Sequence, residues 1–194
     1  MARALGLAGM AVGAALTAPG TAAAVEEVKV GVIAHNICIS TCDIAGKEDG
    51  PIVDVQVNFH SPGVLRVIGA PKPFVALSPN LSGDPSFASA GLEWRWEFAE
   101  GWALIPGLGL AVHDGETDNK FPNGTPQSTQ FDRDNVLYGS RTLFRTALGV
   151  ERELGERWRI EAMVLHYSHG QILGSGRNQG VDQAGVRIGY RFGT

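Results

Sequence analysis

Residues 158–192 read WRIEAMVLHYSHGQILGSGRNQGVDQAGVRIGYRF, and this stretch decides the fold of the chain. Two alternating segments flank a glycine-rich loop. One parity of the first segment contains Trp158, Ile160, Ala162, Val164, His166 and Ser168. The matching parity of the second contains Asp182, Ala184, Val186, Ile188, Tyr190 and Phe192. Because successive residues of a strand point to opposite faces, we predict an antiparallel hairpin with one apolar face.

Three polar residues interrupt the apolar face of this hairpin. His166, Ser168 and Asp182 all fall at its loop end. A polar group on an apolar face costs free energy unless it has a partner or a function. These three residues are therefore the first candidates for a functional site.

The rest of the chain repeats the alternation. Six further strands are predicted at about residues 28–34, 53–59, 64–77, 88–98, 102–112 and 136–151. Pro71 and Pro73 suggest a bulge or an early exit from the ladder in the third strand. The longest polar stretch, residues 113–135, precedes the sixth. The connections alternate long and short, with short turns near Pro62, Gly101 and Gly155.

This rhythm predicts an all-β fold, an eight-stranded up-and-down transmembrane β-barrel of the outer-membrane type. The charged face would line a narrow interior and the apolar face would meet lipid. A soluble lipocalin-like barrel would use the same alternation with the faces reversed. Long strands and aromatic residues suited to an interface girdle favour the membrane barrel. The aromatic residues are Trp94, Trp96, Trp102, Trp158 and Tyr190.

The N-terminus has the features of a secretory signal peptide. Arg3 precedes an apolar run from Ala4 to Leu16, and small residues end at Ala24. The run is short for a membrane anchor, and Pro19 follows it. We expect a cleaved signal over residues 1–24 and a single β-barrel domain over residues 25–194.

Composition and cysteine usage narrow the function. The formal net charge is −4 and no basic patch is present, which argues against nucleic acid as a partner. Cys38 and Cys42 lie in the polar stretch NICISTCD of a secreted chain, which favours a local disulfide. A metal site is disfavoured because His35 is the one nearby histidine and no second cysteine pair exists.

The polar residues of the hairpin have the chemistry of a serine-hydrolase relay. Ser168 supplies a hydroxyl nucleophile, His166 a general base and Asp182 a carboxylate that orients the base. Counting strands from a periplasmic N-terminus places them at the cell-surface end of the barrel, on the lipid-facing side. Polar groups at a headgroup boundary can also simply be solvated, so parity alone leaves catalysis open.

The motifs HYS, N-x-G-x-D and a final strand ending GYRF resemble the outer-membrane lipid A 3-O-deacylases of the PagL family. The resemblance is specific over residues 158–192. It implies Ser168 as nucleophile, His166 as base and Asp182 as acid, where the family more often has Glu. It also implies an oxyanion or substrate-binding role for Asn178 and Gly170. The family's usual Asn after the serine is His169 here, which we expect to be a solvated loop residue.

The resemblance implies an esterase that removes the 3-O-linked acyl chain of lipid A without metal or cofactor. Its partners would be lipopolysaccharide and the lipid of the cell outer membrane, and the sequence leaves a homodimer open. Two alternatives compete: a non-enzymatic small barrel for adhesion or membrane stabilisation, and a phospholipid lipase. His35 and His60 are expected to be interior hydrogen-bonding groups, since each ends an inward-facing polar row.

Overall fold

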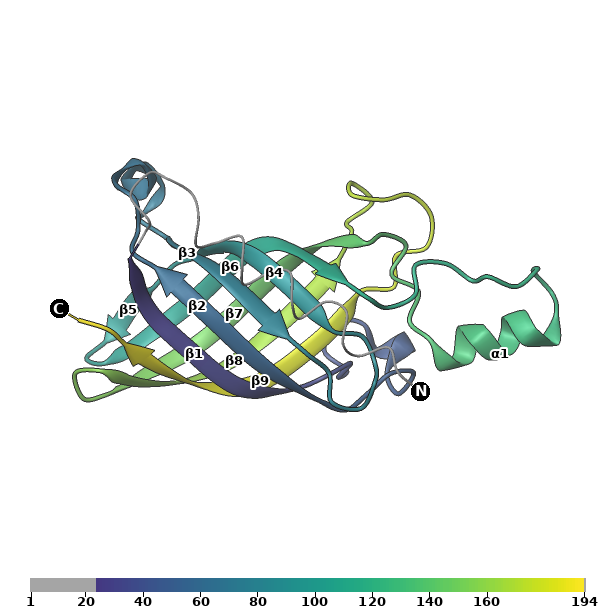
Figure 1. Ribbon diagram of the computed structural model, residues 1–194, viewed down its shortest axis with the longest axis horizontal. Helices are drawn as coiled ribbons and strands as arrows, with labels where there is room; N and C mark the ends of the chain where they lie inside the picture. The colour runs from purple at the N-terminus through teal and green to yellow at the C-terminus, as the bar shows by residue number, and fades with distance from the viewer. Residues whose placement is uncertain (1–23, 194) are drawn as a thin grey trace.

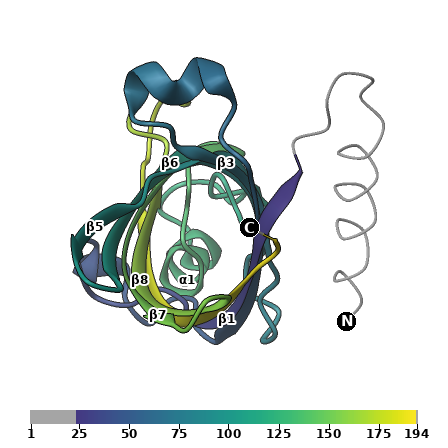
Figure 2. The same ribbon diagram turned by 90° about the vertical axis from the view of Figure 1, so that its left-hand side faces the viewer.

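The computed structural model describes residues 24–193, and they form an antiparallel β-barrel (Figures 1 and 2). The predicted signal peptide lies outside the described residues except for Ala24. The strands are β1 (Val25–Ala34), β2 (Pro51–Phe59), β3 (Lys72–Ser78), β4 (Phe87–Glu93), β5 (Trp96–Ala99), β6 (Trp102–His113), β7 (Thr142–Leu154), β8 (Trp158–Ser168) and β9 (Val181–Arg191). The helices are η2 (Cys42–Ile44), η3 (Gly63–Ile68) and α1 (Pro126–Asp134).

The barrel wall has eight strand positions, as predicted, although nine strands are labelled. Every pairing is antiparallel, and β1 pairs with both β2 and β9. β4 and β5 both pair with β6, so together they form one interrupted strand of the barrel wall. The predicted continuous strand over residues 88–98 was wrong in this detail, because it breaks at Trp94 and Arg95. Trp94 there donates its indole N–H to the carbonyl of Ile68 at 2.8 Å.

The apolar face points outward, which distinguishes this barrel from a soluble one. Side chains such as Val30, Leu108 and Ile188 are exposed on the wall, whereas Lys29, Asp54 and Arg187 on the opposite parity are buried inside. A soluble barrel would show the reverse arrangement. The outward aromatic residues lie at the end of the barrel that carries η3 and the β5–β6 and β7–β8 turns; they are Trp96, Phe98, Trp102, Trp158 and Phe192.

Ion pairs fill the half of the interior that is nearer the β7–β8 turn. Glu161 faces Arg187 across the β8–β9 ladder at 2.8 Å and also accepts from Lys29 at 2.9 Å. Lys29 reaches Glu93 at 2.6 Å, and Arg187 reaches Asp54 at 3.3 Å. Buried charges are tolerated only when they are paired and hydrogen-bonded, so each partner depends on the others.

Apolar and aromatic side chains fill the other half of the interior, nearer the long loops. Phe87 stacks on Tyr167 with ring centroids 4.5 Å apart. Val136 and Tyr138 join this core from the loop before β7. The predicted sixth strand was therefore too long, because β7 begins at Thr142 and residues 136–141 fold over the mouth of the barrel.

Buried Glu48 fastens that covering segment. It accepts hydrogen bonds from the backbone N–H of Val136 at 2.9 Å and from the hydroxyl of Tyr138 at 3.0 Å. Burial, together with the Glu48 carboxylate, raises the pKa of Tyr138. His35 lies 3.5 Å from Glu48 and 2.8 Å from Gln183, so the prediction that His35 is an interior hydrogen-bonding group is confirmed.

The connection between β2 and β3 differs from the prediction. Residues 64–68 belong to the 3-10 helix η3 and not to a strand, and Gly69 ends that helix with φ of 91°. Pro71 supplies no N–H for a ladder, so β3 begins only at Lys72. His60 precedes this helix and is exposed, 3.3 Å from Glu26, which corrects its predicted interior position.

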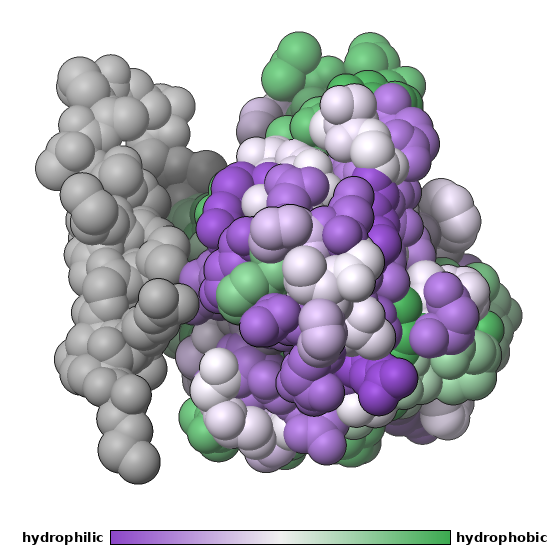
Figure 3. Space-filling view, turned by 90° about the vertical axis from the view of Figure 1, so that its right-hand side faces the viewer, coloured by the Kyte–Doolittle hydropathy of each residue, from purple (hydrophilic) through white to green (hydrophobic). Residues whose placement is uncertain are grey.

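The long loops gather at the opposite end of the barrel, where Figure 3 shows a mainly hydrophilic surface. α1 stands beyond that end in Figure 1 and is capped by the Thr125 side chain. Asn119 and Arg177 donate to Asp132 and hold the pKa of its carboxyl below the usual range. Within residues 24–193, no helix is long and apolar enough to cross a membrane.

Candidate active site

His166 and Asp182 meet on adjacent strands. They are direct partners in the β8–β9 register, both on the outward face near the long-loop end. The imidazole Nδ1 of His166 lies 2.7 Å from Oδ1 of Asp182. The histidine side chain is 36% exposed and the aspartate side chain only 3%. A buried carboxylate bonded to Nδ1 fixes the ring and leaves Nε2 available as a base.

Ser168 lies two residues beyond His166 on the same face of β8. It is half-buried, ends the strand and pairs with Phe144. Within residues 24–193, no hydrogen bond joins its hydroxyl to His166. The structure thus brings the histidine and the aspartate together and places the serine beside them. Because catalytic hydrogen bonds often tighten only when substrate is bound, Ser168 stays a candidate partner of His166.

The loop after Ser168 is held by His169. Its backbone N–H donates to Oδ1 of Asn178 at 3.1 Å, and its Nδ1 accepts from the N–H of Gln171 at 3.1 Å. Its Nε2 lies 3.1 Å from the carbonyl of Arg177. His169 is fully buried, so the expectation of a solvated residue was wrong. The ring instead organises the turn that contains Gly170, whose φ is 59°.

Gly180 is a feature of the site that sequence reasoning missed. A Cβ at this position would lie 2.9 Å from Cε1 and 3.2 Å from Nε2 of His166. The backbone therefore packs directly against the imidazole and confines it. The signal was present in the sequence as the central glycine of N-x-G-x-D.

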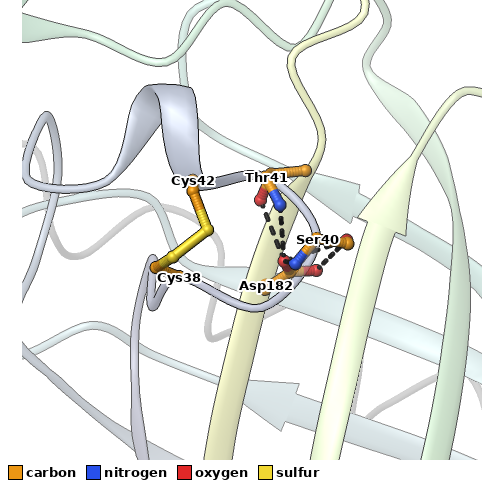
Figure 4. Close-up of a disulfide and its surroundings, with 5 residues drawn as sticks. All are labelled: Cys38, Ser40, Thr41, Cys42 and Asp182. Carbon is orange, nitrogen blue, oxygen red and sulfur yellow. Dashed lines mark hydrogen bonds between the residues drawn. A yellow bond between two sulfur atoms is a disulfide. The ribbon is translucent and has the colours of Figure 1, made fainter.

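A second missed feature is the cysteine loop, residues 38–42, which the predicted disulfide closes. Cys38 and Cys42 are bonded, which confirms that prediction. Figure 4 shows Ser40 and Thr41 of this loop donating hydrogen bonds to Asp182. Their sequence signal was the polar pair between two cysteines, but nothing in the sequence indicated what they would contact.

An apolar groove of about 240 Å³ runs from this site along the outer wall of the barrel. Its lining residues are Ile39, Ser40, Thr146, Ala147, Leu148, Val164, Leu165, His166 and Asp182. The imidazole and carboxylate are thus at the polar end of a groove that is otherwise mainly hydrocarbon. In the part of the chain that the structure describes, no group of three or more His, Cys, Asp or Glu residues could hold a metal ion.

The fold and site define a class: a small outer-membrane β-barrel with a hydrogen-bonded histidine–aspartate pair on its outward face. The family model described as lipid A 3-O-deacylase (PagL) matches residues 76–191. The chain belongs to this family, and is thus an outer-membrane ester hydrolase. The match favours the deacylase over the non-enzymatic barrel and the phospholipid lipase.

Solved structures agree on the fold. The crystal structure of the outer membrane enzyme PagL is similar with a TM-score of 0.59 at 14% identity, covering 86% of this chain and 99% of that one. The N-terminal β-barrel domain of Pseudomonas aeruginosa OprF gives a TM-score of 0.50 at 10% identity, covering 86% and 98%. None of the curated proteins compared with this chain matches it.

Proposed function

We propose that Ser168, His166 and Asp182 form the relay by which this protein removes the 3-O-linked acyl chain of lipid A. The observation that carries the proposal is the 2.7 Å contact between His166 and Asp182 on the lipid-facing side of the barrel. The pair lies on the outside of the barrel, apart from the buried ion pairs that join the strands in its interior. This position suits a substrate that arrives by lateral diffusion in the outer leaflet.

The chemistry follows from the roles of the three groups. Nε2 of His166 takes the proton of the Ser168 hydroxyl as its oxygen attacks the ester carbonyl. The tetrahedral intermediate collapses, and the leaving lipid A alkoxide takes that proton from His166. Water, activated by the same imidazole, then hydrolyses the acyl-enzyme and releases the fatty acid. Asp182 keeps the proton on Nδ1 and stabilises the imidazolium formed in each half-reaction.

The loop after Ser168 provides the oxyanion donors in this proposal. The backbone N–H of Gly170 and the side chain of Asn178 are our candidates, because a tetrahedral oxyanion needs preorganised donors beside the nucleophile. The His169 contacts with Asn178 and Arg177 support a fixed conformation for this loop. A flexible loop would have to be ordered during the reaction.

The groove between β7 and β8 is our candidate site for the acyl chain to be cleaved. Leu148 and Val164, which pair two residues away from His166, line the groove, and so does Ile39 of the cysteine loop. An acyl chain there would keep contact with the hydrocarbon of the membrane, while its ester lies level with the imidazole. No enclosed pocket is required, because the bilayer itself solvates the rest of the substrate.

The test is the mass of lipid A after incubation with purified protein in mixed micelles. Wild-type protein should remove one hydroxyacyl chain, and Ser168→Ala should leave lipid A intact while remaining a heat-modifiable barrel. Ser175→Ala, an exposed serine of the same loop, is the matched control and should be fully active. Release of fatty acid from phospholipid with lipid A unchanged would contradict the proposal and indicate a lipase.

A further inference from the structure

We propose that the cysteine loop is a positioning element for catalysis, in which Ser40 and Thr41 hold the Asp182 carboxylate in register with His166. This inference rests on the proposed relay and extends it. It assigns a role to a segment more than a hundred residues away in sequence from the hairpin that carries the relay.

The contacts are concentrated on one carboxylate. Ser40 donates to Asp182 through its backbone N–H and through its hydroxyl, which lies 2.9 Å from each carboxylate oxygen. Thr41 donates through its backbone N–H at 2.9 Å and through its hydroxyl at 3.1 Å, both to Oδ2. Two neighbouring residues thus use both of their donors on the same side chain.

The two oxygens of Asp182 have different partners. Among the donors of residues 24–193, Oδ2 accepts only from the loop, through both donors of Ser40 and both of Thr41. Oδ1 faces the Nδ1 of His166, and the one group of the loop that donates to it is the Ser40 hydroxyl. By saturating Oδ2, the loop prevents rotation of the carboxylate and keeps Oδ1 directed at the imidazole.

Burial makes these donors necessary. Asp182 is 2% exposed, and an ionised carboxylate removed from water is unfavourable unless hydrogen bonds replace its hydration. One bond from His166 leaves most of its acceptor capacity unused. The N–H and O–H groups of the cysteine loop fill that capacity and favour the charged form, which the relay needs to stabilise the imidazolium.

The loop itself is anchored at both ends. The backbone N–H of Ile37 donates to the carbonyl of Asp182 at 3.0 Å, which attaches the start of the loop to β9. The Cys38–Cys42 disulfide then closes the segment around Ser40 and Thr41. Asn36 donates its side-chain amide to the carbonyl of Ile44 at 2.9 Å, outside the disulfide. The donors are consequently fixed before substrate arrives.

Ser40 is placed as a positioning residue and not as a second nucleophile. Its hydroxyl lies 3.4 Å from Nδ1 of His166, the nitrogen that pairs with Asp182. A nucleophile must give its proton to the other ring nitrogen, Nε2. Reaction with an alkyl fluorophosphonate should therefore label Ser168 and leave Ser40 unmodified, as determined by peptide mass.

The experiment uses full-length folded protein in mixed micelles with lipid A, and compares Ser40→Ala, Thr41→Val and the double variant. Each lost hydroxyl is a hydrogen bond to a charged group, so kcat should fall roughly tenfold for each single variant, with KM little changed. The rate of fluorophosphonate labelling of Ser168 should fall in parallel. Thr41→Ser keeps the hydroxyl that Thr41→Val lacks, and should therefore retain most of the wild-type activity.

Two further comparisons separate positioning from general destabilisation. In an Asp182→Asn background, Ser40→Ala should cost little more, because the group on which it acts is already altered. Reduction of wild-type protein with dithiothreitol should lower kcat, whereas the Cys38→Ser/Cys42→Ser variant should start low and not respond. The matched controls are Ser82→Ala in the β3–β4 loop and Thr129→Val in α1, both exposed, and they should behave as wild type.

The inference is overturned if the Ser40 and Thr41 variants keep wild-type kcat and labelling rates while Ser168→Ala is inactive. It is also overturned if the losses appear only in KM, or if they are undiminished in the Asp182→Asn background. Full activity of Ser168→Ala would instead refute the proposed relay itself. The two failures are therefore distinguishable within the same set of proteins.

Discussion

Gly180 lies so close to His166 that a Cβ on the glycine would come within 2.9 Å of the imidazole Cε1. We expect Gly180→Ala to displace the ring from Asp182 and to lower kcat by about tenfold to a hundredfold, since small misplacements of catalytic groups are costly. Lipid A deacylation measures the effect. Gly63→Ala, where a Cβ meets nothing within 4 Å, is the matched control. An active Gly180→Ala protein would show that the imidazole position is not critical.

The relay residues should behave as one unit. His166→Ala should lower deacylation by orders of magnitude, and the double change with Ser168→Ala should cost little more than either alone. Asp182→Asn keeps the shape but removes the charge that stabilises the imidazolium, so its loss should also be severe. Rates are measured on lipid A with heat-modifiability as the folding control. Additive losses in the double variant would contradict a shared mechanism.

His169 is expected to matter because it is buried and organises the turn after Ser168. His169→Ala removes the acceptor for the Gln171 N–H and the contact with the Arg177 carbonyl, and should lower kcat severalfold by loosening that loop. His169→Asn, which has the family's usual residue, should retain more activity because an amide oxygen can still accept. Equal activity of both variants and wild type would remove His169 from the account.

The interior ion pairs should govern stability and not catalysis. Glu161→Gln leaves Lys29 and Arg187 buried with less compensating charge, and should lower the free energy of unfolding by about 3 kcal/mol or more. Urea unfolding in lipid vesicles gives the value. Asp134→Asn, at the exposed end of α1, should change stability by less than ~0.5 kcal/mol. A Glu161→Gln protein as stable as wild type would mean that the network adjusts around the lost charge.

Membrane orientation can be tested on intact cells. Epitopes inserted near Gly46, Asn119 or Ser175 should be accessible from outside, because these positions lie in the long loops around the site. Epitopes near Pro62 or Gly155 should be inaccessible until the outer membrane is permeabilised. Detection at Gly155 and not at Ser175 would invert the orientation and separate the site from the outer leaflet.

Sequence periodicity was sufficient to predict the barrel and the shared face of His166 and Asp182. Because a strand alternates strictly, the parity of residues 158–168 and 181–191 already placed His166 and Asp182 on one face. Antiparallel pairing of the two strands across the loop of residues 169–180 then brought them together. No such local rule connects Ser40 or Thr41 to Asp182, since that contact depends on how a distant loop folds back. The burial of His169 was missed for the same reason.

The errors in the strands also have local causes. Residues 64–68 are rich in the β-branched and apolar residue types that favour strands, but Gly69 and Pro71 interrupt the chain before a ladder can form, and a 3-10 helix results. Val136 to Tyr138 are apolar because they cover the barrel mouth, and periodicity alone cannot distinguish a covering segment from the start of a strand.

The filled interior of the barrel determines how water can reach the proposed active site. Salt bridges occupy the half of the interior nearer the β7–β8 turn, and stacked aromatic rings occupy the half nearer the long loops. The barrel should therefore contain no open channel and show no measurable ionic conductance. Water that hydrolyses an acyl-enzyme must then come from the extracellular medium between the loops, and not from the periplasm. In the proposed relay, the two reactants therefore reach Ser168 by separate routes: lipid A laterally through the outer leaflet, and water from the extracellular side.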